Sequence, residues 1–415
     1  MQHFHYQDDE LYAEQIPLHA IAKEIGTPCY VYSRAAIEEN WLAFDNALQH
    51  KPHRICYAVK ANSNIAILNL LAKLGSGFDI VSIGELERVI AAGGDPNKII
   101  FSGVGKSKSE IQRALEIGIY CFNVESEPEL SRINDIALQI NKIAHISLRI
   151  NPNIDAKTHP YIATGLKENK FGIEIENAWT LITKIKNLTH IKLIGISCHI
   201  GSQLTELDPF IEALDRILEL VKIIKEKNIN LQHINIGGGL GIRYHSENPP
   251  TTKQYITAIC EHLSHSTLEI IIEPGRAIIA NAGMLLTRVE YLKCTPHKNF
   301  AVVDAAMNDL LRPALYDAWQ NILPIKQDIK PDKTLYDIVG PVCESADFLG
   351  KDRLLSLLPD DILAIQTAGA YGFSMSSNYN SRPRAAEVLV DKNKFHVIRQ
   401  RETITDLFAL EKIVP

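Results

Sequence analysis

The chain has 415 residues, and 46% of them are hydrophobic, which is enough for a large core and indicates two domains or one large domain with an addition. The net charge of -6 comes from acids and bases mixed along the sequence, so there is no basic stripe of the kind that binds nucleic acid. Because no apolar run approaches the roughly 20 residues that span a bilayer, and no secretory signal opens the chain, we expect a cytoplasmic protein without a membrane partner.

The seven cysteines are widely scattered and contain no C-x-x-C pair. This pattern favours reduced thiols over a disulfide framework or a zinc site, and we expect no metal.

A strand-helix unit recurs from about residue 55 to 280. Its eight β-branched runs are RICYAVKAN (54–62), GFDIVS (77–82), KIIFSG (98–103), YCFNVES (120–126), HISLRIN (145–151), LIGISCHIG (193–201), HINIGGG (233–239) and EIIIEPG (269–275). Continuous apolar strands indicate a parallel sheet covered by helices on both faces. Eight units in unbroken order predict an α/β fold with a TIM (β/α)8 barrel, and a doubly wound sheet is the alternative.

The alternation of strand and helix patterns ends after about residue 284. Beyond it, short β-rich runs such as LLTRVEYL (285–292) and RAAEVLV (384–390) predict a mostly antiparallel C-terminal domain. The early run PCYVYS (28–33) is a candidate to pair with it. We therefore expect a barrel over residues 35–284 and a β-rich domain formed by residues 1–34 and 285–415.

One connection inside the barrel region, residues 151–173, is unusually long. Loops of this length are often lids or binding loops, so this connection could be a lid or a surface loop without a functional role.

Polar residues follow the predicted strands, and in a TIM barrel the active site gathers at those carboxyl ends. They are Lys60, Asp79, Ser82, Ser102, Asn123, Arg149, Asn151, His199, Ser202, Gly237 to Gly239, and Glu273 to Arg276.

Lys60 follows the apolar YAV of a strand that should be covered on both faces. A desolvated amine there would have a lowered pKa and would suit Schiff-base chemistry, whereas most lysines extend their charged end to the surface.

Three consecutive glycines in NIGGGLG (235–241) could let backbone N–H groups bind a phosphate, or could simply form a turn. Their place after the seventh strand favours phosphate, since many TIM barrels bind it there. Glu273 is either a carboxylate for the ring nitrogen of pyridoxal phosphate or a structural carboxylate. His199 could stack on the cofactor, and Ser202 could donate to phosphate.

Seven motifs together resemble the fold-type III pyridoxal-phosphate-dependent decarboxylases, and among them the members that act on diaminopimelate. They are YAVKAN, HIGSQ, GGGLG, EPGR, GPVCESAD, AGAYG and NYNSRPR, and they occur in the family's order over nearly the whole chain.

The resemblance implies pyridoxal 5'-phosphate as cofactor, with Lys60 as the lysine that carries it. It implies a cofactor shell formed by His199, Ser202, Gly239, Glu273, Pro274, Gly275, Arg276 and Tyr371. It further implies Arg276, Arg312, Tyr316, Glu344 and Tyr371 as substrate ligands and Cys343 as the proton donor. The loop with Cys343 comes from the other subunit in this family, so the resemblance implies a homodimer with shared active sites. Gln320 departs from the family, where histidine is frequent.

The expected reaction is decarboxylation of meso-2,6-diaminopimelate to L-lysine, the last step of lysine biosynthesis. Two arginines suit a second substrate carboxylate, which ornithine and arginine lack at their far ends. An ornithine- or arginine-type decarboxylase and a non-catalytic relative remain alternatives. An alanine racemase is disfavoured, because that family places an arginine at the ring nitrogen.

Overall fold

The computed structural model describes residues 3–155, 165, 169–327 and 332–415. The chain forms two compact units. Unit 1 comprises Met1–Asn40, Arg243–Glu247 and Ile278–Pro415, and unit 2 comprises Trp41–Ile242 and Asn248–Ala277.

Unit 2 contains a closed parallel barrel, so the expected TIM-like fold is confirmed. Within the described residues its eight strands are β5 (His53–Ala58), β6 (Gly77–Ile80), β7 (Ile99–Phe101), β8 (Cys121–Val124), β9 (Ala144–Asn151), β11 (Ile191–Ser197), β12 (His233–Asn235) and β13 (Glu269–Ile272). The last strand pairs with the first, with Ile270 opposite His53, and this pairing closes the barrel. A short strand, β10 (Ile173–Glu174), lies beside β9.

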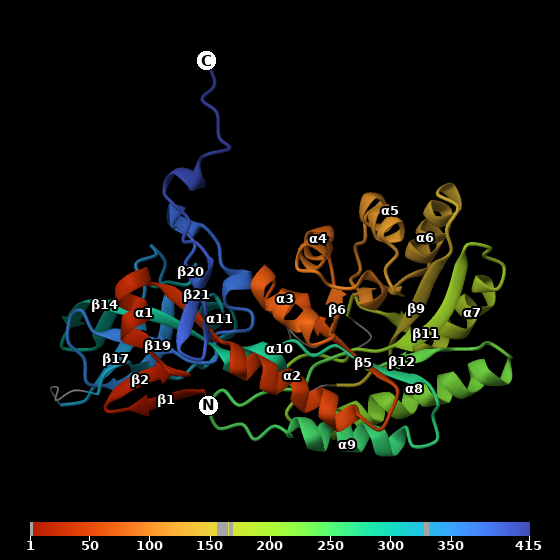
Figure 1. Ribbon diagram of the computed structural model, residues 1–415, viewed down its shortest axis with the longest axis horizontal. Coiled ribbons are helices and arrows are strands. Elements are labelled where there is room, and N and C mark those ends of the chain that lie inside the picture. Colours follow the sequence, from red (N-terminus) through yellow and green to blue (C-terminus); the bar gives the residue numbers. More distant parts are fainter. Residues whose placement is uncertain (1–2, 156–164, 166–168, 328–331) are drawn as a thin grey trace. The chain divides into compact units, whose positions relative to one another are not determined.

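Helices follow the barrel strands and surround them (Figure 1). They are α3 (Ile65–Lys73), α4 (Ile83–Ala91), α5 (Lys108–Ile117), α6 (Glu127–Gln139), α7 (Ile175–Ile185), α8 (Asp208–Glu226) and α9 (Thr252–His262). Local sequence sets their ends. Helix α5, for example, starts at a capping box between Ser107 and Glu110 and ends at Gly118 in the left-handed conformation.

The barrel interior is apolar and tightly packed. One cluster of buried side chains joins Cys56 and Cys121 to Ile100, Ile194 and Ile271. All seven cysteines of the chain are free thiols.

Unit 1 is built mainly from antiparallel strands, as expected. Its strands are β1 (Phe4–Gln7), β2 (Glu10–Ala13), β3 (Ile16–Pro17), β4 (Cys29–Ser33), β14 (Gly283–Cys294), β15 (Asn299–Val303), β16 (Ile322–Pro324), β17 (Thr334–Val339), β18 (Phe348–Leu355), β19 (Ile362–Ile365), β20 (Ala386–Asp391) and β21 (Lys394–Arg399). Its helices are α1 (Leu18–Ile25) and α11 (Arg312–Tyr316), while α2 (Arg34–Leu48) and α10 (Arg276–Ile279) contain unit boundaries.

Strand β4 is central to the larger sheet of unit 1. It pairs antiparallel with β14 and parallel with β20, so the expected pairing of PCYVYS with the C-terminal region is confirmed. All five of its residues are buried.

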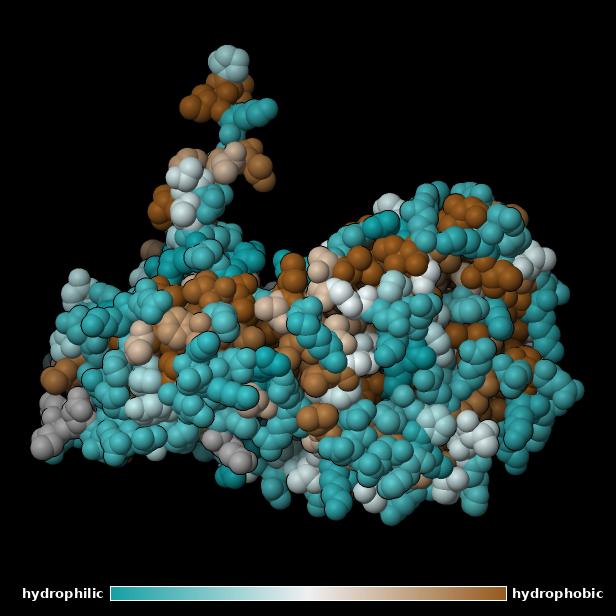
Figure 2. Space-filling model, in the orientation of Figure 1, coloured by the Kyte–Doolittle hydropathy of each residue, from teal (hydrophilic) through white to brown (hydrophobic). Residues whose placement is uncertain are grey.

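The surface is largely hydrophilic in the view of Figure 2, with apolar side chains at the C-terminal end of the chain. There Leu410 is 97% exposed and Ile413 is 99% exposed. Among the described residues, no helix is both long and apolar enough to cross a membrane.

Most of the central part of the long connection, residues 156–164 and 166–168, lies outside the described residues. A lid formed by residues 151–173 therefore remains a prediction.

The substitution Gly195→Ala is expected to destabilise the barrel, because the added Cβ would lie 2.0 Å from Nε2 of the fully buried His233. Overpacking of this kind lowers the free energy of unfolding by roughly 1 to 3 kcal/mol. Chemical denaturation followed by circular dichroism would measure the loss. Gly105→Ala is the matched control, since no atom lies within 4 Å of its Cβ position, and equal stability of the two variants would contradict the expectation.

Candidate active site

Lys60 lies just beyond β5, in a short 3-10 turn over Val59–Ala61, and its ammonium forms an ion pair with Asp79 at the end of β6. The Asp79 side chain is 1% exposed, whereas that of Lys60 is 37% exposed. The expectation of a desolvated lysine is therefore only partly met. Its amine has one buried counter-ion and retains access to solvent.

Glu273 follows β13, the strand that closes the barrel onto β5. One of its carboxylate oxygens accepts hydrogen bonds from the side-chain amides of Asn235, at 2.6 Å, and Asn123, at 3.2 Å. Burial raises the pKa of Glu273 to about 7, with a further increase from the charge of Asp79 and an opposing effect from Lys60.

Two asparagines hold this carboxylate in a defined orientation. Asn235 also accepts a hydrogen bond from the N–H of Gly237 at 2.8 Å, which fixes which end of its amide faces Glu273. Asn123 donates to the hydroxyl of Ser102 at 2.9 Å. Asn123 was expected at a strand end but without a role, and Asn235 was not predicted to be a site residue.

His199 follows β11 and faces the glycine loop, which consists of Gly237 to Gly239 after β12. There the N–H of Gly238 donates to Nδ1 of His199 at 3.3 Å. Burial, together with smaller effects of the charges of Arg149 and Lys60, lowers the pKa of His199 to about 3. The ring is thus neutral near pH 7. Because Nδ1 accepts, the proton of the neutral ring belongs on Nε2.

The glycine loop packs closely against its neighbours. A Cβ on Gly238 would lie 2.1 Å from the carbonyl oxygen of Glu273, and one on Gly239 would lie 2.5 Å from that of Gly201. Gly239 also has a φ of +112°, which side chains rarely adopt. Close packing alone therefore requires glycine here, whether or not the loop binds an anion.

The EPGR turn brings Arg276 beside Ser202, whose hydroxyl accepts a hydrogen bond from the guanidinium at 3.1 Å. The carbonyl of Pro274 accepts the N–H of Ala58 at 3.1 Å. A Cβ on Gly275 would lie 3.0 Å from those of Ala58 and Ala61, so this glycine lets the turn pack against the Lys60 segment.

Several polar residues at the strand ends have local structural partners. Ser82 caps α4 by accepting the N–H of Glu85 at 3.2 Å. Arg149 donates to Glu125 at 3.0 Å in a buried ion pair, and Asn151 accepts the N–H of Asn153 at 2.9 Å. Burial raises the pKa of Glu85 to about 7, with an opposing effect from the charge of Lys60, and this nearby acid was not predicted to be a site residue.

The remaining predicted site residues lie in unit 1. The Arg312 guanidinium is 5.4 Å from the centre of the Tyr244 ring and 5.5 Å from that of Tyr316. Tyr371 has a φ of 56°. Cys343 and Glu344 are exposed at a loop between β17 and β18.

The residues of unit 2 fit a bound pyridoxal phosphate. Lys60 provides an amine, and the hydroxyl of Ser202 and the guanidinium of Arg276 lie together as polar groups that suit a phosphate. Among the described residues, the buried Asp79 Oδ1 and Asn123 Oδ1 have no hydrogen-bond partner, so polar capacity remains at this end of the barrel.

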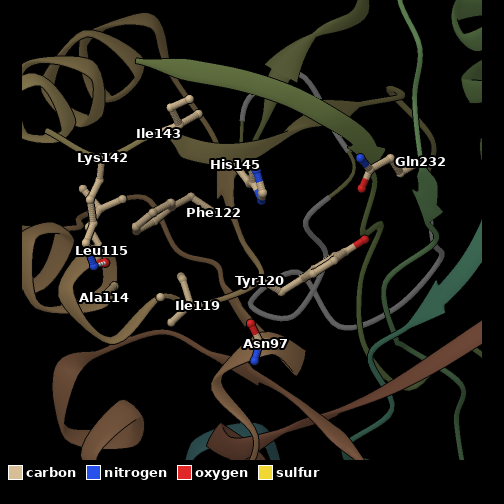
Figure 3. Close-up of a pocket in the computed structure, with 11 residues that line it drawn as sticks. Asn97, Ala114, Leu115, Ile119, Tyr120, Phe122, Lys142, Ile143, His145 and Gln232 are labelled. Carbon is tan, nitrogen blue, oxygen red and sulfur yellow. Dashed lines mark hydrogen bonds between the residues drawn. The ribbon is translucent and has the colours of Figure 1, made fainter.

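A cavity of about 370 Å³ lies at the other end of the barrel (Figure 3). Its polar lining residues precede or begin strands, namely Asn97, Tyr120, His145 and Gln232. The ammonium of Lys142, also in the lining, donates to two carbonyls at the end of α5, at 2.6 and 2.9 Å. The cavity is therefore separate from the carboxyl-end cluster that contains Lys60 and Glu273.

Comparison with known proteins identifies related sequences and structures. The family described as "Pyridoxal-dependent decarboxylase, pyridoxal binding domain" matches residues 34–280. The diaminopimelate decarboxylase of Vibrio cholerae is 58% identical over 417 aligned residues, with 100% of both chains covered. That of Pseudomonas aeruginosa is 56% identical, again over 100% of both.

Solved structures of diaminopimelate decarboxylases are also similar to this chain. The diaminopimelate decarboxylase of Helicobacter pylori, complexed with L-lysine, is 45% identical with a TM-score of 0.92, covering 95% of this chain and 99% of that one. The enzyme of M. jannaschii, in co-complex with L-lysine, is 40% identical with a TM-score of 0.94, covering 99% and 98%.

Neutral His199 should make the cofactor-free protein less stable in acid. Its pKa is about 6.5 when unfolded and about 3 when folded, so the unfolded chain binds more protons between these values and stability falls as the pH falls. At pH 5 the loss relative to pH 7 is roughly 2 kcal/mol from this residue. Denaturation at both pH values would test this, since His199→Gln should show a difference smaller by about that amount. An unchanged difference would contradict the assignment.

Proposed function

Because this chain belongs to the pyridoxal-dependent decarboxylases, and within them to the diaminopimelate decarboxylases, we propose that it converts meso-2,6-diaminopimelate to L-lysine and carbon dioxide. The observation that carries the proposal is the juxtaposition of a lysine and a half-buried carboxylate at the ends of adjacent strands. Lys60 follows β5, Glu273 follows β13, and the charge of Lys60 acts on the pKa of Glu273. The reaction is the step that yields lysine in its biosynthesis.

Pyridoxal phosphate, when bound, supplies the electron sink for the pair released with carbon dioxide. The residues proposed to hold it are Lys60, through its amine, and His199, Ser202, Gly239, Glu273, Pro274, Gly275, Arg276 and Tyr371. The neutral ring of His199 suits stacking without adding charge, and the hydroxyl of Ser202 and the backbone of Gly239 suit phosphate.

Glu273 is proposed to face the ring nitrogen and to retain a proton there. Desolvation raises the pKa of this carboxyl, and a protonated ring nitrogen beside it would favour the ionised carboxylate that this role requires. The amides of Asn123 and Asn235 keep the carboxylate in one orientation, so the proton is held in one place. Asp79 is proposed to hold the ammonium of Lys60 when that amine is not engaged.

Cys343 is proposed to return a proton to the carbon that loses its carboxyl group. An exposed thiol at a loop tip is accessible for such a role, unlike the buried thiols of the barrel core. We further propose that the protein is a cytoplasmic homodimer with shared sites, in which Cys343 and Glu344 act in the site of the other subunit.

The proposed substrate ligands are Arg276, Arg312, Tyr316, Glu344 and Tyr371. Guanidinium groups bind carboxylates through paired hydrogen bonds, and both arginines are buried, with exposures of 4% for Arg276 and 7% for Arg312. The carboxylate of Glu344 would then bind the distal ammonium. The complexes of the two solved relatives with L-lysine support this choice of product.

Carbon dioxide release from the purified protein with added pyridoxal phosphate tests the function directly. Offered meso-diaminopimelate, ornithine, arginine and lysine separately, the protein is expected to release carbon dioxide from diaminopimelate alone. Release from ornithine or arginine instead would contradict the assignment of the two arginines. Absence of release from all four would favour a non-catalytic relative.

Replacement of Cys343 by alanine is expected to preserve the bound cofactor, measured by its absorbance, and to reduce kcat about 100-fold or more, since positioned proton donors contribute about 10²- to 10⁴-fold. Cys294→Ala is the matched control because that thiol is also exposed. Wild-type turnover in Cys343→Ala would remove this thiol from the reaction.

A further inference from the structure

The loop that carries Cys343 spans Gly340 to Asp347, between β17 and β18. The side chains of Cys343 and Glu344 at its tip are exposed, so burial does not fix them. A proton donor must nevertheless be held within a fraction of an ångström of its productive position. Something other than core packing must therefore orient the tip.

The base of the loop is held by the carboxylate of Asp347. Its two oxygens accept the N–H groups of Met307 and Val342, each at 2.7 Å. Glu344 N–H donates to the carbonyl of Val342 at 2.8 Å, which makes a tight turn centred on Cys343. These bonds fix where the loop starts and ends.

The tip is held by one residue of the NYNSRPR motif, which the proposed reaction does not use. The side-chain oxygen of Asn380 accepts the N–H of Cys343 at 2.9 Å. The neighbouring Tyr379 lies close enough to the tip for Glu344 to raise its pKa. The bond from Asn380 is the contact that orients the backbone of Cys343.

The segment that provides these side chains is itself well anchored. Arg382 donates to the side chain of Asn308 at 3.0 Å and to the carbonyl of Asp304. Asn308 in turn donates to the carbonyl of Ser377 at 3.3 Å and accepts, through its own carbonyl, the N–H of Ser377 at 2.9 Å. The motif therefore forms a rigid support for the loop.

The backbone at Asn380 explains the choice of residue. Its φ is 55°, in the left-handed region where asparagine is among the few residues other than glycine that are well tolerated. Asparagine is short, neutral and carries an acceptor oxygen, so it satisfies both the backbone and the N–H of Cys343.

We propose that Asn380 is a positioning residue that holds Cys343 in its reactive geometry, an inference that rests on the proposed role of Cys343 as proton donor. Asn380 acts within the same chain as the loop. It touches the loop and need not touch the substrate.

Three variants of the full-length protein, loaded with pyridoxal phosphate, test the proposal. Asn380→Gly removes the acceptor oxygen and tolerates the left-handed backbone, whereas Asn380→Asp keeps an oxygen in the same place. Asn228→Gly is the matched control, because Asn228 is exposed, lies in unit 2 and has a similar φ of 58°.

Two readouts are needed, amide hydrogen exchange of the peptide that contains Cys343, and steady-state kinetics with meso-diaminopimelate. In Asn380→Gly the Cys343 amide is expected to exchange faster and kcat to fall about five- to tenfold, as expected for loss of one hydrogen bond, while KM stays within about twofold. In Asn380→Asp, which keeps an acceptor oxygen, the exchange rate of the Cys343 amide and kcat should both lie close to the wild-type values. Asn228→Gly should change neither, and melting temperatures confirm folding in each case.

Unchanged exchange in Asn380→Gly, or faster exchange with wild-type kcat, would overturn the positioning role. A parallel measurement on Cys343→Ala separates this from failure of the proposed donor. If Cys343→Ala keeps wild-type turnover, the donor assignment fails and the positioning role falls with it. If that variant is inactive while Asn380→Gly is normal, only the positioning role is wrong.

Discussion

Closure of the barrel by pairing of β13 with β5 is the constraint on which the site depends. The two strands are about 215 residues apart in sequence, yet Ile270 lies opposite His53 and Ile272 opposite Ile55. The segments that follow them, with Glu273 and Lys60, therefore emerge side by side at the carboxyl end of the barrel. The fit of Gly275 against the Lys60 segment maintains this approach, because a larger residue would meet Ala58 and Ala61. Closure of the sheet into a barrel therefore brings Lys60 and Glu273 together although they are far apart in the sequence.

The same strand pairing determines which charged groups lie near one another at the carboxyl end of the barrel. Asp79 and Glu273 both lie near the ammonium of Lys60, which forms an ion pair with Asp79. Desolvation of Glu273 and the neighbouring charge of Asp79 disfavour its ionised form, so its pKa rises. A cation placed opposite Glu273 would relieve that cost. The barrel thus holds a carboxyl group whose ionisation is linked to what binds beside it.

The order of elements was readable from the sequence, because buried parallel strands give continuous apolar runs and turn residues separate them. All eight predicted barrel strands are present, and the roles of particular side chains were harder to infer. The partial exposure of Lys60 and its pairing with Asp79 depend on contacts between different strands. Asn235 is the last residue of the short strand β12, and nothing in its sequence indicates a bond to Glu273. The contact of Asn380 with Cys343 joins segments almost 40 residues apart, and neither segment alone indicates the other.

Strand β4 has a consequence for how the protein is made. Its five residues are all buried, and it pairs with β20, with Cys29 opposite Ala386, roughly 350 positions later in the chain. On the ribosome the barrel strands from β5 to β13 are complete long before β20 exists. At ~5 to 20 residues per second, β4 waits tens of seconds for its parallel neighbour. The yield of folded protein in the cell therefore depends on whether β4 avoids pairing with strand edges of other chains while the remainder of its own chain is synthesised.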